Sequence, residues 1–180
     1  DLGADVVGID ASKTMIDICN QQNIESHQLI FGSEVLPDGL ALKKFDIIIA
    51  NNVVNHSNSP LSFFEEVENL LLDEGIFIFE QPYWGDTVDS LRLDQVYHEH
   101  VCYFTLKSAL AFSEKVNLKV INASKTPYHG GSLRTICSKN YQKEESEEIK
   151  ALLETEERKG YFSEKFYKNL NYDLAISKYN

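Results

Sequence analysis

Four consecutive residues, Tyr97-His98-Glu99-His100, place a phenol, two imidazoles and a carboxylate next to one another. Apolar and aromatic residues follow directly, over residues 101–104. Histidine titrates near neutral pH and a neighbouring carboxylate tunes its pKa, so this composition suits a site that transfers protons. The alternative is that His98 and His100 are half-buried polar residues at the end of a helix or strand. The four residues alone do not decide between these interpretations.

The composition is typical of one globular domain, or of one domain with an extension. The chain has 180 residues, 43% of them hydrophobic, and no apolar run that would predict a membrane-spanning helix or a signal peptide. Its net charge of -11 argues against nucleic-acid binding, which requires a basic surface. The three cysteines are odd in number and far apart, which predicts reduced thiols and no metal site. We therefore expect a cytoplasmic protein without a nucleic-acid or membrane partner.

Short apolar runs alternate with amphipathic helical segments in the first half of the chain. This alternation is typical of βαβ units in a doubly wound α/β sheet. The run over residues 45–50 is continuous enough to predict a strand buried on both faces. Ser12 and Pro60 each mark the start of a helix. The predicted strands of this half cover residues 4–10, 28–31, 45–50 and 76–80.

The pattern changes after Trp84. Two further strands, over residues 118–123 and from Ser132 through Cys137, are predicted to form an antiparallel edge of the sheet. Gly130 and Gly131 precede the second of them and indicate a backbone conformation or close approach that other residues resist. From Lys143 a run of glutamates indicates a solvated helix face. We expect a domain over residues 1–140 and a helical segment over residues 141–180 that leads into a C-terminal domain.

Polar side chains follow three of the predicted strands, where open α/β sheets bind ligands. Asp10 ends the first strand, and an acid there accepts hydrogen bonds from ribose hydroxyls in nucleotide-binding folds, although it is also a common turn residue. Asn52 and His56 follow residues 45–50, and either contact a ligand or stabilise a turn. Tyr83 and Trp84 follow residues 76–80, and either wall a ligand site or belong to the core.

Five segments occur in the order seen in one protein family. Two are specific: Tyr97-His98-Glu99-His100 with Tyr103-Phe104 shortly after, and His129-Gly130-Gly131-Ser132-Leu133-Arg134. The other three cover residues 7–10, 45–56 and 80–84. In these segments the chain resembles the S-adenosylmethionine-dependent C-methyltransferases that act on nucleotide-linked 4-keto deoxysugars. The resemblance covers residues 4–140.

The resemblance implies a Rossmann-like methyltransferase domain, with S-adenosylmethionine as cofactor and a nucleotide-linked sugar as substrate. Members of the family also carry an N-terminal zinc module, a first strand and a glycine-rich loop that holds the methionine end of the cofactor. Because the present sequence starts after these parts, we expect it to be an N-terminally incomplete piece with reduced affinity for the cofactor.

The resemblance also implies roles for individual residues. His100 is expected to be the base that removes a proton next to the ketone, and Glu99 and Tyr97 are expected to support it. On an extended segment, alternate side chains point to opposite sides, so these residues converge only if the backbone turns. The expected cofactor-binding residues are Asp10, Asn52 and His56. The expected substrate-binding residues are Tyr83, His129 and Arg134, with a turn role for His129 and a surface ion pair for Arg134 as alternatives.

Two other functions stay open at this point. The first is another S-adenosylmethionine-dependent methyltransferase, for example an O-methyltransferase, which needs no base suited to a C–H acid. The second is a non-catalytic α/β fragment that binds a nucleotide.

Overall fold

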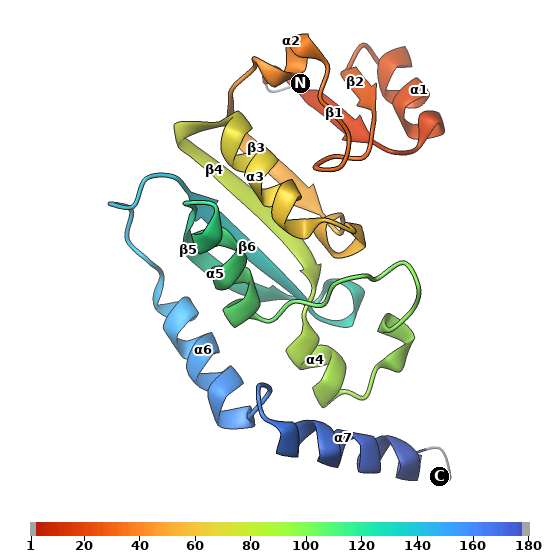
Figure 1. Ribbon diagram of the computed structural model, residues 1–180, viewed down its shortest axis with the longest axis vertical. Coiled ribbons are helices and arrows are strands. Elements are labelled where there is room, and N and C mark those ends of the chain that lie inside the picture. Colours follow the sequence, from red (N-terminus) through yellow and green to blue (C-terminus); the bar gives the residue numbers. More distant parts are fainter. Residues whose placement is uncertain (1–2, 178–180) are drawn as a thin grey trace. The chain divides into compact units, whose positions relative to one another are not determined.

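Parallel pairing of two short strands organises the first part of the chain. The structure is a computed structural model that describes residues 3–177, and the chain divides into two compact units between Lys43 and Lys44 (Figure 1). Each unit is described separately. The first contains β1 (Val7–Asp10), α1 (Lys13–Gln21), β2 (Glu25–Gln28) and α2 (Asp38–Ala41).

The first unit is a single β–α–β crossover followed by a short helix. Val7 lies opposite Glu25 and Asp10 opposite Gln28 in the parallel ladder. The Ser12 hydroxyl accepts a hydrogen bond from the Met15 N–H, so the predicted helix start is confirmed. The second strand lies earlier than predicted, because the apolar residues that marked it directly follow the hydrogen-bonded segment.

The second unit is built on a four-stranded mixed sheet in the order β3-β4-β6-β5. Strands β3 (Phe45–Asn51) and β4 (Leu71–Pro82) are parallel and are joined by α3 (Pro60–Leu70). Strand β6 (Ser132–Ser138) is antiparallel to both β4 and β5 (Lys119–Thr126), which confirms the predicted antiparallel edge. The doubly wound α/β architecture therefore follows the sequence pattern.

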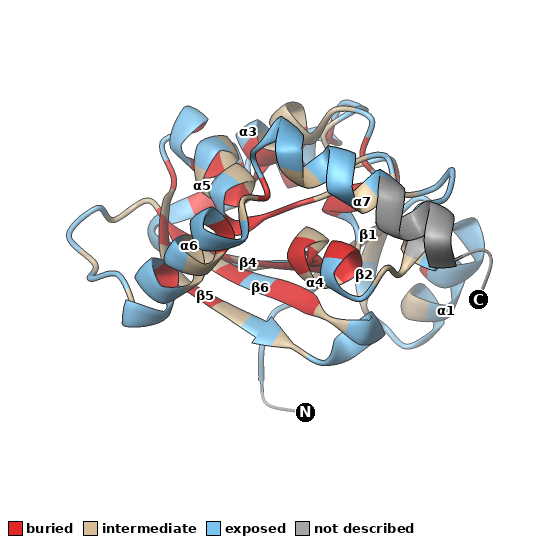
Figure 2. Cartoon of the chain, turned by 90° about the horizontal axis from the view of Figure 1, so that it is seen from below, coloured by how far each residue is buried: buried red, intermediate tan, exposed pale blue. Residues whose placement is uncertain are grey.

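Phenylalanine rings form the core between one face of this sheet and helices α3 and α5 (Leu106–Lys115). Phe64 lies 5.5 Å from Phe77 and 5.2 Å from Phe79, measured between ring centroids, and all three rings are buried. Figure 2 shows the buried residues concentrated along β4 and β6. Strands β4 and β6 are the two central strands of this sheet, and the loops after β3 and β4 extend from its edge.

Strand β3 is less buried than its sequence predicts. Ile47 and Ile49 are 54% and 62% exposed, so the expectation of burial on both faces is wrong. The physical reason is the sheet face on which these two side chains lie. Ile47 and Ile49 lie opposite Ile76 and Ile78, and residues opposite one another share a sheet face. That face is opposite to the one that packs its phenylalanines.

Short helical turns connect the sheet to the remaining helices. They are η1 (Val54–His56), α4 (Trp84–Asp89), η2 (Leu93–Gln95) and η3 (Tyr128–Gly130). Helices α6 (Glu147–Lys159) and α7 (Glu164–Ser177) follow the last strand. None of the helices within residues 3–177 combines the length and the hydrophobicity needed to cross a membrane.

One glutamate of α6 is an exception to the predicted solvated face. Glu156 is completely buried, and its Oε1 accepts hydrogen bonds from the Leu106 N–H at 2.6 Å and the Tyr83 hydroxyl at 3.0 Å. Its Oε2 accepts the Lys107 N–H at 3.1 Å. The carboxylate thus caps the N-terminus of α5. Helix α6 packs on β5 and α5. The division expected at residue 140 stays a prediction.

Candidate active site

The Tyr97–His100 segment forms a tight turn. The His100 N–H donates to the Tyr97 carbonyl at 3.1 Å, which is the reversal that the sequence required for convergence. It brings two side chains together: the Tyr97 hydroxyl lies 3.1 Å from His100 Nε2. His98 and Glu99 occupy the corner of the turn, and His98 is 89% exposed with its Nε2 3.8 Å from a Glu99 oxygen. The turn therefore brings the side chains of Tyr97 and His100 into contact, and leaves those of His98 and Glu99 outside that contact.

The backbone carbonyl of Gln95 determines which nitrogen of His100 is basic. It lies 2.8 Å from Nδ1, and because a carbonyl only accepts, Nδ1 carries the proton. In the neutral ring Nε2 then has the lone pair, to which the Tyr97 hydroxyl donates. The Tyr103 hydroxyl donates to the same carbonyl at 3.5 Å. The imidazole is thus held in one tautomer by a backbone carbonyl. Because the carbonyl belongs to the main chain, it is present whatever side chain stands at position 95.

Residues after the turn fix it to the carboxyl ends of β3 and β4. The Val101 and Cys102 N–H groups both donate to the Asn55 carbonyl of η1, at 2.9 and 3.1 Å. The Phe104 carbonyl accepts the Trp84 N–H at 2.9 Å, and the Phe104 ring is buried. The turn therefore lies at the sheet edge where open α/β sheets bind ligands.

His56 lies against His100 as a result. The two ring centroids are 5.0 Å apart and the rings meet edge to face. The sequence placed His56 among the cofactor-binding residues, whereas the structure makes it a neighbour of the expected base. The pKa of His100 lies below its ordinary value because partial burial disfavours imidazolium, and His56 and His129 act in the same direction. The Gln95 carbonyl and Glu99 oppose this shift.

The predicted close approach at the two glycines is confirmed. A Cβ atom on Gly130 would lie 1.2 Å from a nitrogen of Arg92, and one on Gly131 would lie 2.4 Å from an Asp86 oxygen. Both glycines have positive φ, and His129 before them has a φ of 50°. This turn therefore carries an exposed histidine on a strained backbone. Partial burial is the largest cause of the lowered pKa of His100, and His129 is one of the groups that add to it.

Two predicted substrate-binding residues are engaged elsewhere. Tyr83 is only 2% exposed, and burial together with Glu156 raises its pKa. Its phenol is bonded to Glu156 and is not free to contact a substrate, so Tyr83 is the core residue of the second interpretation. Arg134 donates to the buried carboxylate of Glu80 at 2.7 Å, which is the ion pair given as its alternative.

Two of the residues expected to bind the cofactor, Asp10 and Asn52, each have an oxygen that can accept a further hydrogen bond. Asp10 uses Oδ1 to accept the Ser12 N–H at 2.7 Å, and its other oxygen accepts no hydrogen bond from residues 3–177. Asn52 adopts a φ of 52° at the end of β3, and its buried Oδ1 has no partner in the described part of the chain. A free carboxylate oxygen and a free amide oxygen suit the hydroxyl and amino groups of a nucleoside. Asp10 belongs to the first unit and Asn52 to the second.

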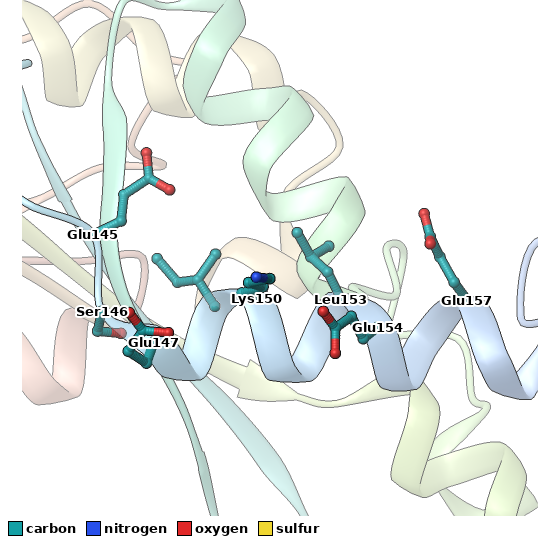
Figure 3. Close-up of a pocket in the computed structure, with 8 residues that line it drawn as sticks. Glu145, Ser146, Glu147, Lys150, Leu153, Glu154 and Glu157 are labelled. Carbon is teal, nitrogen blue, oxygen red and sulfur yellow. The ribbon is translucent and has the colours of Figure 1, made fainter.

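Two cavities of the second unit have linings that exclude residues 97–100. One, of about 500 Å³, runs along α6, where Figure 3 shows acidic side chains such as Glu145, Glu154 and Glu157. The other, of about 420 Å³, has its two lysines paired with Asp86 and Asp89. The candidate active site is therefore identified by the chemistry of the turn and not by either of these two cavities. Among residues 3–177, no three His, Cys, Asp or Glu side chains are grouped to hold a metal ion.

Sequence reasoning missed the groups that hold the site together. The Gln95 and Asn55 carbonyls are backbone atoms, which residue types do not reveal. Arg92 and Asp86, which approach the glycine turn, were also missed. The glycine pair signalled that something approaches closely, but it carried no information on which residue does so.

A family model described as a methyltransferase domain matches residues 2–156. The C-methyltransferase NovU of Streptomyces niveus is 27% identical over 136 residues, which cover 73% of this chain and 31% of that protein. The ubiquinone biosynthesis O-methyltransferase of Pelagibacter ubique (strain HTCC1062) is 37% identical over 79 residues, covering 42% of this chain and 32% of that protein. The matched part of the chain thus spans about a third of the length of these curated relatives.

Solved structures agree in fold at low identity. A S-adenosylmethionine-dependent methyltransferase from Clostridium acetobutylicum ATCC 824 superposes with a TM-score of 0.56 at 13% identity, covering 75% of each chain. The PH0226 protein from Pyrococcus horikoshii OT3 gives a TM-score of 0.57 at 20% identity, covering 76% of this chain and 72% of that one. At such identities the likeness concerns the arrangement of strands and helices.

Proposed function

Because the chain belongs to the methyltransferase domain family and has its Rossmann-like α/β fold, we propose that it is part of a C-methyltransferase. The enzyme transfers a methyl group from S-adenosylmethionine to a carbon next to the ketone of a nucleotide-linked 4-keto sugar. The observation that carries the proposal is the Tyr97–His100 turn, which presents an imidazole with a basic Nε2 at the ligand-binding edge of the sheet. Similarity to a C-methyltransferase over 136 residues supports it.

Asp10 of the first unit and Asn52 of the second are each proposed, separately, as a contact to the cofactor. The free carboxylate oxygen of Asp10 accepts the ribose hydroxyls, and the unpartnered Oδ1 of Asn52 accepts a further donor of the nucleoside. When bound, S-adenosylmethionine supplies an electrophilic methyl group.

His100 carries the proton transfer. Its Nε2 removes the proton from the carbon next to the ketone, while the Gln95 carbonyl keeps the other ring proton on Nδ1. The lowered pKa of His100 keeps the ring neutral, and so basic, at neutral pH. Glu99 then stabilises the imidazolium by its charge, without contacting the ring.

The Tyr97 hydroxyl is proposed to stabilise the negative charge that develops on the enolate oxygen. Its O–H donates to His100 Nε2 in this structure, so it moves aside when the base takes the substrate proton. The same O–H is then free to donate to the enolate oxygen, and the half-exposed ring has room to turn. His129 and Arg134 remain the proposed contacts to the sugar nucleotide, His129 through its exposed ring and Arg134 through the guanidinium nitrogens other than Nε, which pairs with Glu80.

The position of the transferred methyl group tests this proposal. The full-length protein is incubated with ¹³C-methyl-labelled S-adenosylmethionine and a nucleotide-linked 4-keto-6-deoxy sugar, and the product is examined by NMR. A labelled methyl carbon bonded to a ring carbon next to the ketone is the expected result. A methoxy signal, or a product labelled nowhere on the sugar, contradicts it.

O-methyl transfer is the second candidate. The observation in its favour is the 37% identity to an O-methyltransferase over 79 residues. Transfer to oxygen needs no base strong enough for a C–H acid, so a methoxy product that forms without His100 favours this alternative.

A further inference from the structure

Arg92 joins two segments that lie far apart in the sequence. Its guanidinium donates to the His129 carbonyl at 3.3 Å and to both oxygens of Asp94, at 3.4 and 2.9 Å. Its own carbonyl accepts the Gln95 N–H at 3.2 Å. The Gln95 carbonyl in turn accepts from His100 Nδ1. A continuous series of hydrogen bonds therefore runs from His100 through Gln95 and Arg92 to the backbone of His129.

Gly130 is shaped for this contact. Its φ of 80° is a conformation that other L-residues rarely adopt, and any Cβ would fall 1.2 Å from the Arg92 guanidinium. On the other side of the turn, Asp86 occupies the space that a Cβ on Gly131 would need, and Lys125 pairs with Asp86. The strained His129 backbone is thus held from two directions.

We propose that Arg92 is a positioning residue that holds the His129 turn beside the Tyr97–His100 turn, so that both imidazoles serve one site. The ion pair with Asp94 alone does not explain Arg92, since partly exposed pairs contribute little to stability. What distinguishes Arg92 is its simultaneous contact with both turns. This role of Arg92 rests on the proposed function in one respect, that His100 is the base.

The pKa of His100 reports the position of His129. The groups that face His100 are His56 from η1, Glu99 and Tyr97 from its own turn, Tyr103, and His129. His129 lowers the pKa of His100, so moving His129 away raises that pKa. Loss of the Arg92 charge would act in the same direction, and the experiment must separate the two causes.

The test is an NMR titration of the histidine ring signals in the 180-residue chain, assigned with His→Gln variants. His129→Gln is expected to raise the measured pKa of His100 by a few tenths, and Arg92→Ala to raise it similarly. In the His129→Gln background, Arg92→Ala is expected to raise the pKa of His100 by less than it does in the unaltered chain, because only the loss of the Arg92 charge then acts. Gly130→Ala keeps the Arg92 charge but breaks the contact, and is expected to give the same rise. Arg158→Ala, which removes an exposed arginine of α6, is the matched control without effect.

Two results would overturn the proposal. One is a rise with Arg92→Ala that persists undiminished in the His129→Gln background, because it would come from the lost charge alone. The other is an unchanged pKa of His100 in Gly130→Ala. The titration requires no turnover, so it fails or succeeds independently of the methyl-transfer experiment.

Discussion

A single backbone carbonyl, that of Gln95, determines the chemistry open to His100. It fixes the Nδ1–H tautomer and leaves Nε2 as the basic atom. The Tyr97 hydroxyl then donates to Nε2, so the proposed base and the proposed oxyanion donor are hydrogen-bonded to each other in this structure. This hydrogen bond explains how a group proposed to accept a proton and a group proposed to donate a hydrogen bond lie side by side in one turn.

The lowered pKa of His100 leads to a prediction for the pH dependence. His100 acts as a base only when neutral, so the rate of substrate C–H exchange rises with pH and levels off above its pKa. Because burial and the neighbouring imidazoles lower that pKa, the midpoint is expected below 6.5, the ordinary value for histidine. Exchange rates measured between pH 5 and pH 8 in the full-length protein check this. A midpoint above 6.5 contradicts the electrostatic environment described here.

Individual residues were predicted from the sequence with uneven success. The proximity of Tyr97 and His100 was foreseeable because both lie in one short segment, where a local turn brings them together. Tyr83 was misjudged because its partner, Glu156, is 73 residues away, and nothing local signals such a bond. His56 was placed at the right sheet edge, but its contact with His100 depends on how the loop folds over η1.

The buried carboxylate of Glu156 connects several helices and strands of the second unit. One carboxylate satisfies two N–H groups of α5 and the phenol that follows β4, and so joins α5, α6 and the sheet. In the sequence it is indistinguishable from its exposed neighbours, since the helical period places several glutamates on α6. Burial of this position is set by tertiary packing, which composition and periodicity do not encode.

Replacing Glu156 tests this function of the carboxylate. Glu156→Ala leaves two buried donors and the part-buried Lys107 N–H without their acceptor. An unsatisfied buried donor costs about 1–3 kcal/mol, so we expect a loss of roughly 2 kcal/mol or more in the free energy of unfolding. Glu157→Ala, an exposed neighbour on the same helix, is expected to change it by less than about 0.5 kcal/mol. Urea unfolding of the 180-residue chain measures both. Equal stabilities of the two variants would show that the carboxylate does not join these elements.

The elements themselves were largely predictable. Alternating apolar runs and helices define the parallel pair β3 and β4, and the two later strands form the antiparallel edge as expected. The strand β2 was shifted because its own residues are polar and the apolar residues follow it. The exposure of Ile47 and Ile49 was missed, since a continuous apolar run carries no information on what covers each face.

At the scale of the molecule, the proposed cofactor contact of Asp10 and the proposed base belong to different units, and each is supported by contacts within its own unit. Asp10 belongs to the first unit and the Tyr97–His100 turn to the second. Because these residues lie in different units, cofactor binding and proton transfer can be tested with separate substitutions.

Removing the Asp10 carboxylate tests the cofactor site. Hydrogen bonds to a charged acceptor contribute about 1.5–3 kcal/mol, so Asp10→Ala is expected to weaken S-adenosylhomocysteine binding by roughly 10- to 100-fold. Calorimetry on the full-length protein measures this. Asp17→Ala is the matched control, because Asp17 is an exposed acid of α1 paired only with Lys13. Equal affinities of the two variants would remove Asp10 from the site.

Deuterium exchange at the substrate tests the central claim, that His100 is the base, most directly. The full-length protein and its His100→Asn variant are incubated with a nucleotide-linked 4-keto-6-deoxy sugar in D₂O, without a methyl donor, and exchange next to the ketone is followed by NMR. Exchange is expected in the unaltered protein and in His98→Asn, whose histidine is exposed in the same turn. His100→Asn is expected to slow exchange by about 10²- to 10⁴-fold. Exchange in His100→Asn at the rate of the unaltered protein would contradict the assignment of His100 as the base.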